Sequence, residues 1–191
     1  MSSTLRGYER HKSDYYVTPI DRIELFIDEF IKYEPNAFSG GWILDPTAGG
    51  DAKHPMSYPT AIKNKLNKNT YTIDIREDSL ADIKGDFLKL KLDFKPVVII
   101  TNPPFNISRE IIEKSLDIVK DNGFVIMLLR LNYFGGKTRR DMWDKQMPKY
   151  CFVHNRRMSF TEDNKTDSVE YAHFVWQKRH KPEFTMLKVI D

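Results

Sequence analysis

The chain has 191 residues, of which 40% are hydrophobic and 30% are charged. This composition excludes a largely disordered protein, and the length suits one domain with a sizeable core. The formal net charge of +3 permits a polyanionic partner without requiring one. A single cysteine, Cys151, excludes an internal disulfide framework, and no apolar run approaches the ~20 residues that span a bilayer. We therefore expect a cytoplasmic protein without membrane association.

A polar arm and an amphipathic helix are the first predicted elements. Residues 1–14 are polar and basic, which predicts a flexible arm before a single domain over residues 15–191. Thr18 is suited to the N-cap of a helix whose first residue is Pro19. Apolar residues then follow at helical spacing from Ile23, so one face of this helix is expected to be buried.

Strands and helices alternate in the predicted middle of the chain. Residues 42–44 predict a strand that runs into a glycine-rich turn, and Pro59 predicts the start of a helix that ends by Asn67. The elements predicted next are a strand at 70–75, a short helical connection at 76–84 and a strand end at 85–90.

The apolar run PVVIIT, residues 96–101, is the clearest strand of the sequence. A continuous apolar run is typical of a parallel strand that is covered on both faces. Ser108 is then suited to cap a helix that Gly123 ends. The remaining predicted elements are strands at 123–129, 150–155 and 170–177, an edge strand at 184–190 and a polar loop at 132–146.

This order predicts an α/β fold, a doubly wound and mostly parallel sheet with a C-terminal antiparallel hairpin. In such sheets, ligands bind at the carboxyl ends of the strands. Polar side chains follow successive predicted strands there, namely Asp45, Asp74, Asp86 and Asn102. The sequence therefore predicts that these four side chains converge on one site.

The segment Asn102-Pro103-Pro104-Phe105 has unusual hydrogen-bonding properties. Neither proline has an N–H group, so the backbone offers carbonyl acceptors without matching donors, and Asn102 adds a side-chain carbonyl. Such a site suits a ligand that donates two hydrogen bonds, for example a primary amine on a base, and Phe105 offers a surface for stacking. An ordinary turn would also use these residue types, and this alternative stays open.

Taken together, these motifs resemble the S-adenosylmethionine-dependent amino-methyltransferases, and most closely the phage-type DNA adenine-N6 methyltransferases. The resemblance covers nearly the whole chain in order. The segments that carry it are DYYVTP (14–19), ILDPTAGG (43–50), TIDI (72–75), GDF (85–87), NPPF (102–105) and SFTEDNKTDSVEYAHFVW (159–176). The fold that it implies is the Rossmann-like class I methyltransferase fold, and the location would be the host cytoplasm if the protein is viral.

The resemblance implies S-adenosyl-L-methionine as cofactor and the N6 amine of adenine in DNA as the methyl acceptor. The implied catalytic segment is Asn102, Pro103, Pro104 and Phe105. The implied cofactor contacts are Thr18 near the carboxylate, Asp45 and Gly49 at the methionine end, Asp74 at the ribose, and Asp86 with Phe87 at the adenine.

The sequence also departs from the family pattern. Asp51 stands where the family often has a third glycine, and the insert 51–59 delays the next helix. These departures leave open a non-catalytic nucleic-acid-binding protein that kept the fold. Methylation of RNA adenine or of another amine also stays open.

No separate target-recognition domain is expected in this chain. Lys137, Arg139 and Arg140 are predicted to contact nucleic-acid phosphates from the polar loop. Histidine and cysteine spacing indicates no metal site. GGKT at 135–138 is no phosphate-binding loop, because Leu131 stands where that motif needs a glycine. The oligomeric state does not follow from the sequence.

Overall fold

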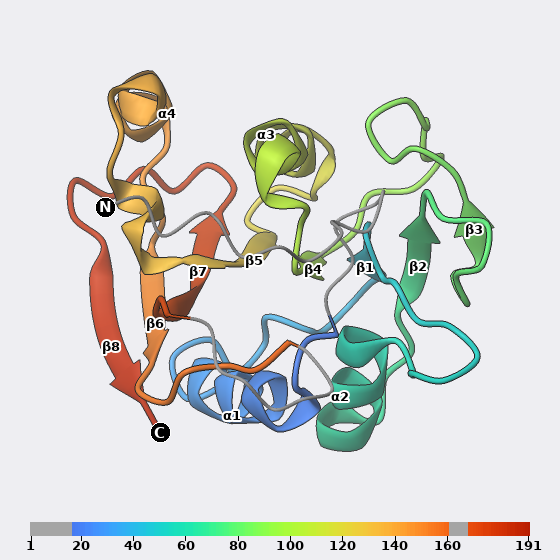
Figure 1. Cartoon of the computed structure of the whole chain (residues 1–191). Coiled ribbons are helices and arrows are strands. Elements are labelled where there is room, and N and C mark those ends of the chain that lie inside the picture. The colour runs from blue at the N-terminus through green and yellow to red at the C-terminus, as the bar shows by residue number, and fades with distance from the viewer. Residues whose placement is uncertain (1–16, 161–167) are drawn as a thin grey trace.

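A computed structural model describes residues 17–160 and 168–191. The predicted arm at 1–14 and part of the motif at 159–176 therefore lie outside the described residues. The described chain forms an eight-stranded sheet in the order β3-β2-β1-β4-β5-β7-β6-β8 (Figure 1). Its strands are β1 (Ile43–Asp45), β2 (Tyr71–Asp74), β3 (Ile83–Lys84), β4 (Val98–Thr101), β5 (Phe124–Arg130), β6 (Tyr150–His154), β7 (Tyr171–Gln177) and β8 (Met186–Ile190).

Only the pairings of β7 are antiparallel, with β5 on one side and β6 on the other. The other five strand pairings are parallel, including the pairing of the edge strand β8 with β6. The predicted fold class, a mostly parallel sheet that ends with an antiparallel strand pair, is confirmed. The predicted edge strand at the end of the chain is confirmed as well.

Helices cover both faces of the sheet. The helices α1 (Ile20–Phe30) and α2 (Ser57–Leu66) pack on one face, and α3 (Ser108–Ile118) and α4 (Arg140–Lys145) lie on the other (Figure 1). Two buried apolar clusters accordingly sandwich the sheet. The central strand residues 98–101 and 124–129 are buried throughout, which explains why their sequences are continuous apolar runs rather than alternating ones.

Two of the predicted helix starts are wrong. The helix α1 begins at Ile20, and the Thr18 side chain makes no capping hydrogen bond. The carbonyl of Pro19 instead accepts hydrogen bonds from the N–H groups of Arg22 and Ile23. The helix α2 begins at Ser57, so Pro59 is its third residue rather than its first. A proline fits anywhere in the first turn, because those N–H groups have no partner within the helix.

The predicted helical connection at 76–84 and the strand at 85–90 are also wrong. Residues 76–82 form turns, β3 occupies only Ile83–Lys84, and 86–89 form a further turn. Side-chain hydrogen bonds account for this: the Ala81 N–H donates to Ser79 Oγ, and the Leu88 N–H donates to Asp86 Oδ1. Short polar side chains that bind nearby N–H groups compete with regular backbone hydrogen bonding.

The region predicted as a polar loop at 132–146 contains short helices. These are the 3₁₀ helices η2 (Leu131–Phe134) and η3 (Lys137–Arg139), followed by α4. A third such helix, η1 (Phe105–Ile107), lies directly before α3. Ser108 is the first residue of α3 rather than its cap. Its hydroxyl donates to the carbonyl of Phe105 and not to an N–H group of the helix. The helix ends at Ile118, five residues before the predicted stop at Gly123.

Phe30, the last residue of α1, packs among aromatic rings in the apolar cluster between α1 and the sheet. Its ring is fully buried and contacts the rings of Phe38, Phe124 and Phe152 at centroid distances of 5.4–6.2 Å. We expect Phe30→Ala to lower the free energy of unfolding by about 3–5 kcal/mol, because it removes buried surface and leaves a cavity. Urea denaturation measures the change. Phe184→Ala is the matched control, since Phe184 is 77% exposed, and a similar loss there would contradict the prediction.

Candidate active site

A cleft lies at the carboxyl ends of the neighbouring strands β2, β1 and β4. It is lined by the loop after β1, the turn after β2, the turn after β3 and the segment after β4, together with Thr18 and the first residues of α2. Among the predicted site residues, those that line it are Thr18, Asp74, Asp86, Phe87 and Asn102 to Phe105. Five others are outside the lining, namely Asp45, Gly49, Lys137, Arg139 and Arg140.

The glycine-rich loop after β1 is held firmly against β2. Gly49 and Gly50 both have positive φ angles, 64° and 74°, which glycine adopts without strain. The N–H of Gly49 donates to Asp74 Oδ2 at 2.8 Å. A Cβ atom on Gly50 would lie 2.6 Å from Cγ of Met56, so this position has no room for a side chain. The loop thus presents bare backbone to the cleft at Gly50.

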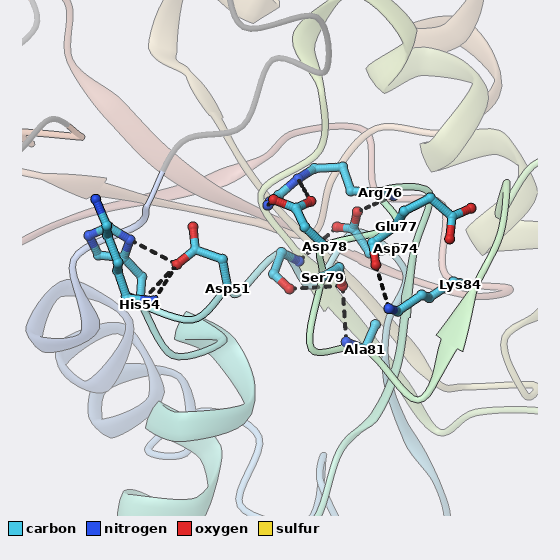
Figure 2. A network of polar contacts seen from close by, with 11 residues as sticks. Asp51, His54, Asp74, Arg76, Glu77, Asp78, Ser79, Ala81 and Lys84 are labelled. Carbon is cyan, nitrogen blue, oxygen red and sulfur yellow. Dashed lines mark hydrogen bonds and ion pairs between the residues drawn. The ribbon is translucent and has the colours of Figure 1, made fainter.

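Asp51, the departure from the glycine pattern, belongs to the insert and not to the cleft lining. Its Oδ1 accepts hydrogen bonds from the N–H groups of Lys53 and His54 at 2.8 and 2.9 Å (Figure 2). These backbone donors lower the pKa of Asp51. Because φ of residue 51 is not positive and its side chain faces the insert, a glycine is not required here. The departure therefore leaves the cleft open.

Hydrogen bonds join the turn after β2 to the glycine-rich loop. Asp74 Oδ1 accepts a hydrogen bond from the N–H of Arg76, and the hydroxyl of Ser79 donates to the carbonyl of Gly49 (Figure 2). Lys84 closes the same turn by donating to the carbonyl of Glu77. Ile75 lines the cleft although its side chain is 63% exposed. Our sequence analysis missed Ile75, whose only signal is that it follows Asp74.

The turn after β3 supplies Asp86 and Phe87. Asp86 is partly exposed and pairs with Lys89 at 3.3 Å, whereas Phe87 is buried. Lys114 of α3 fixes the turn by donating to the carbonyls of Phe87 and Leu90 at 2.5 and 2.6 Å. Its Nζ also lies 5.0 Å from the centre of the Phe87 ring. Lys114 could not be predicted from the sequence, because its partners lie more than 20 positions away.

Asn102 follows the last residue of β4 and is held at two points. The hydroxyl of Thr47 donates to its backbone carbonyl at 3.2 Å, and the Asn102 side-chain Nδ2 donates to Oγ1 of Thr18 at 3.0 Å. In the part of the chain that the structure describes, nothing donates to Asn102 Oδ1 or to the Pro103 carbonyl. Both residues line the cleft, and each carries an acceptor oxygen.

Phe105, the first residue of η1, lies beside other flat side chains. The guanidinium of Arg130 lies 4.9 Å from the centre of its ring, and the ring of Tyr171 lies 6.1 Å away. Arg130 Nε also donates to the Tyr171 hydroxyl at 3.3 Å. Phe105 is thus supported within a small aromatic and cationic cluster at the end of the cleft.

The predicted phosphate-contacting arginines have partners within the chain. Arg139 donates to the carbonyl of Tyr133 at 2.8 Å and stacks on that ring, with 4.4 Å between guanidinium and ring centre. Arg140 pairs with Asp144 at 2.9 Å. Lys137 is exposed. Contact of these residues with phosphates stays a prediction.

Asp45 lies beneath the glycine-rich loop and is completely buried. Its Oδ1 accepts a hydrogen bond from the Thr47 N–H at 3.2 Å, but Oδ2 has no partner among the residues described. Burial raises the pKa of Asp45 to about 7, against the opposing effect of hydrogen bonds from Thr101 and Thr47. Asp45 is therefore a buried acid that is poorly solvated when ionised.

Several solved structures that are similar to this chain are described as methyltransferases. A proposed class I S-adenosylmethionine-dependent methyltransferase from Listeria monocytogenes aligns over 91% of this chain with 14% identity and a TM-score of 0.64. A proposed RNA methyltransferase from Pyrococcus horikoshii aligns over 92% of this chain and 93% of its own length, with 14% identity and a TM-score of 0.60. The EcoKI M protein, of a type I restriction enzyme, aligns over 85% of this chain with 15% identity and a TM-score of 0.56.

This chain has the class I methyltransferase fold. It spans 65% of the length of the Listeria protein and 44% of the EcoKI M protein. No family model matches the sequence, and no curated protein matches it. Over the described residues, no helix has the length and apolarity to cross a membrane. Over the same residues, no group of three or more His, Cys, Asp or Glu side chains is arranged to hold a metal ion.

The buried carboxyl of Asp45 predicts a pH dependence of stability. Its folded-state pKa of about 7 lies above the ordinary 3.8, so its contribution is most favourable below about pH 4 and is lost as the pH rises to about 7. Relative to Asp45→Asn, the wild-type free energy of unfolding should fall by roughly 1.4 kcal/mol per pH unit between about pH 5 and 7, and then level off. Urea denaturation of both proteins across this range checks it, and parallel profiles would contradict it.

Proposed function

We propose that this protein transfers a methyl group from S-adenosyl-L-methionine to the exocyclic N6 amine of adenine in DNA. The observation that carries the proposal is the pair of acceptors at the end of β4, Asn102 Oδ1 and the Pro103 carbonyl, in the lining of a cleft on a class I methyltransferase fold. A primary amine is the group that such a pair would bind best, because it can give one hydrogen to each oxygen.

The rest of the cleft fits the proposed cofactor. Gly50 leaves bare backbone where a side chain would not fit, so a ligand can approach the loop closely. Asp74 would accept from ribose hydroxyls, since a carboxylate keeps acceptor sites beyond its two backbone donors. Asp86 would accept from the adenine amine, and Ile75 would pack against the ring. Thr18, Asp45 and Gly49 are proposed near the amino-acid end, Asp45 from beneath the loop and Gly49 as part of it.

When bound, the cofactor would supply an electrophilic methyl group; its transfer to the amine would leave S-adenosylhomocysteine, and the amine proton would pass to solvent. The work of this chain is then to position the amine. Asn102 Oδ1 and the Pro103 carbonyl would each accept one amine hydrogen, which favours a pyramidal nitrogen with its lone pair directed at the methyl group. Positive charge that develops on the nitrogen is stabilised by the two fixed carbonyl dipoles.

Phe105 would hold the ring of the target base. Stacking of a base on an aromatic side chain contributes about 1–3 kcal/mol, which partly offsets the few kcal/mol needed to flip a base out of a duplex. Arg130 and Tyr171 support the Phe105 ring and would keep its orientation fixed.

DNA is the substrate that we favour, and RNA is the second candidate. The similar structures include a restriction–modification M protein and a DrdV–DNA complex, which supports a nucleic-acid substrate. The Pyrococcus protein is named as an RNA methyltransferase, and its alignment covers both chains almost fully. The non-catalytic alternative loses its main motivation, because Asp51 does not fill the cleft.

The deciding experiment is incubation with methyl-labelled S-adenosylmethionine and unmethylated DNA, RNA or protein. Digestion and mass analysis of the products then identify the methylated group. N6-methyladenine in DNA is the expected product. The label in RNA or in a protein side chain would redirect the proposal, and the absence of label from all three would refute it.

Asn102→Ala should remove methyl transfer but not cofactor binding. It deletes one of the two acceptors for the amine, and loss of one such polar group typically costs roughly 10²–10³-fold in kcat. The Kd for the cofactor, measured by calorimetry, should stay within a few fold of wild type. An equal loss of binding and turnover would place Asn102 in the cofactor site instead.

Asp74→Asn should weaken cofactor binding more than it lowers kcat. The amide replaces one acceptor oxygen that would receive a ribose hydroxyl, and it repels one of the N–H groups of Gly49 and Arg76. We expect the Kd for the cofactor to rise by roughly 10-fold or more, the cost of one charged hydrogen bond. Glu77→Gln is the matched control, because Glu77 is an exposed carboxylate of the same turn and does not line the cleft. An unchanged Kd for Asp74→Asn would remove Asp74 from the ribose site.

A further inference from the structure

Three aromatic side chains cluster at the end of the sheet that lies opposite the cleft. Trp42 directly precedes β1, Tyr71 is the first residue of β2, and Phe94 lies in the loop before β4. The centre of the Trp42 ring lies 5.5 Å from that of Phe94 and 6.1 Å from that of Tyr71. Because these strands are parallel, their amino ends share one edge of the sheet, and the cleft lies at the other edge.

This aromatic cluster is not part of the buried core. Trp42 is 58% exposed, whereas Trp176 is fully buried and Trp143 is partly buried. Neither Trp42 nor Phe94 belongs to the two apolar clusters that sandwich the sheet. An indole ring left in water forgoes the stabilisation that burial of its apolar surface would provide. Large apolar side chains that gather on a surface are typical of a binding site.

Exposed lysines accompany the aromatic cluster. Two of them flank Phe94 in the loop before β4, and the backbone N–H of the third donates to the carbonyl of Pro96 at 2.8 Å. In the part of the chain that the structure describes, no ion pair or side-chain hydrogen bond engages these three residues, Lys91, Lys95 and Lys120. Of the two neighbouring carboxylates, Asp93 and Asp121, the second is already paired with Arg179 at 2.8 Å. The charge at this end of the sheet is therefore positive.

Aromatic rings beside ammonium groups suit an unpaired nucleic-acid strand. Each unpaired base has a flat face that can stack on an aromatic ring, and each nucleotide carries a phosphate that a lysine can bind. The bases of a duplex are already stacked on both sides, so their faces are not available. An apolar protein surface would use the rings but would leave the lysines without partners. The combination favours a single strand over both.

We propose that this surface, which we call the amino-end patch, binds an unpaired nucleic-acid strand, with bases stacked on its rings and phosphates bound to its lysines. The patch consists of Trp42, Tyr71, Phe94, Lys91, Lys95 and Lys120. The strands β2 and β4 have four residues each, so at about 3.3 Å per residue roughly 13 Å of sheet separates the patch from the cleft. The inference goes beyond the proposed function, because binding at the patch requires no methyl transfer.

Fluorescence anisotropy with a fluorescein-labelled oligothymidine tests the patch. This probe contains no adenine, so it is not a substrate of the proposed reaction. Trp42→Ala should weaken its binding by roughly 5- to 100-fold, the loss expected for one stacked base. Phe184→Ala is the matched control, because it removes a ring that is 77% exposed outside the patch. Equal Kd values for wild type and Trp42→Ala would overturn the proposal.

Trp42→Phe separates stacking from effects on folding. Phenylalanine keeps an aromatic ring, so the Kd for oligothymidine should stay within about 5-fold of wild type. Unlabelled oligothymidine should quench the tryptophan emission of the wild type. The quenching should disappear in Trp42→Phe, because Trp143 and Trp176 lie outside the patch. Quenching that persists in this variant would place the strand elsewhere and overturn the proposal.

Salt dependence tests the role of the lysines. For a single strand, each phosphate contact adds about 0.7 to the slope of log K against log salt concentration. Lys95→Gln should lower this slope by about that amount. Lys145→Gln is the matched control and should not change it, because Lys145 is exposed in α4, where it lies 3.9 Å from Asp141. An unchanged slope in both Lys95→Gln and Lys120→Gln would refute the phosphate contacts.

The outcomes separate this inference from the proposed function. If the protein methylates nothing but Trp42→Ala weakens oligothymidine binding, the proposed function fails and the patch stands. A short G·C duplex should bind equally to wild type and Trp42→Ala, and an equal loss of duplex and single-strand binding would refute stacking on Trp42. Unchanged oligothymidine binding together with a changed sedimentation mass in Trp42→Ala would instead assign the rings to a contact between copies of this protein.

Discussion

The site depends on a backbone that lacks hydrogen-bond donors at the end of β4. Pro103 and Pro104 follow Asn102, so two consecutive residues have carbonyls but no N–H groups. Prolines also restrict the preceding residue to extended conformations, which carries the direction of the strand into the cleft. Among the described residues no printed hydrogen bond reaches Asn102 Oδ1 or the Pro103 carbonyl. The proposed binding of a primary amine rests on these two acceptors.

The order of the strands allows a few hydrogen bonds from one loop to hold the site together. β1 lies between β2 and β4, so the loop after β1 can bind to residues at the ends of both neighbours. Gly49 binds Asp74 on one side, and Thr47 binds Asn102 on the other. Three strand ends are thereby joined by hydrogen bonds across their loops. Positions proposed for the cofactor and for the amine are held relative to each other by the same loop.

The architecture could be predicted from the sequence because its signals are periodic or continuous. The runs at 98–101 and 124–129 are apolar without interruption, and they are the buried central strands of the sheet. Local polar side chains were harder to interpret. A serine such as Ser79 can occur in a helix or in a turn. Here its side-chain hydrogen bonds with Gly49 and Ala81 stabilise the turn. Those partners are fixed only by the fold.

The site was partly predictable for the same reason. Asp74 ends a strand, and Asp86 and Asn102 follow shortly after strands, so parallel topology alone brings them to one edge of the sheet. Asp45 also ends a strand, but its side chain is buried under the loop that follows, which strand order does not reveal. Lys114 and the contact of Thr18 with Asn102 depend on packing between distant segments. Neither has a spacing that a single sequence could show.

The loop after β5 illustrates how charge can be used for architecture instead of binding. Arg109, in the first turn of α3, makes two hydrogen bonds to the carboxylate of Asp141 and a third to the carbonyl of Thr138. Arg139 folds back onto Tyr133 within the same loop. These contacts hold the loop against α3, the helix that follows residues 102–105. Since guanidinium groups engaged in this way have fewer hydrogens for phosphates, exposed basic residues such as Lys137 must supply more of any attraction to a polyanion.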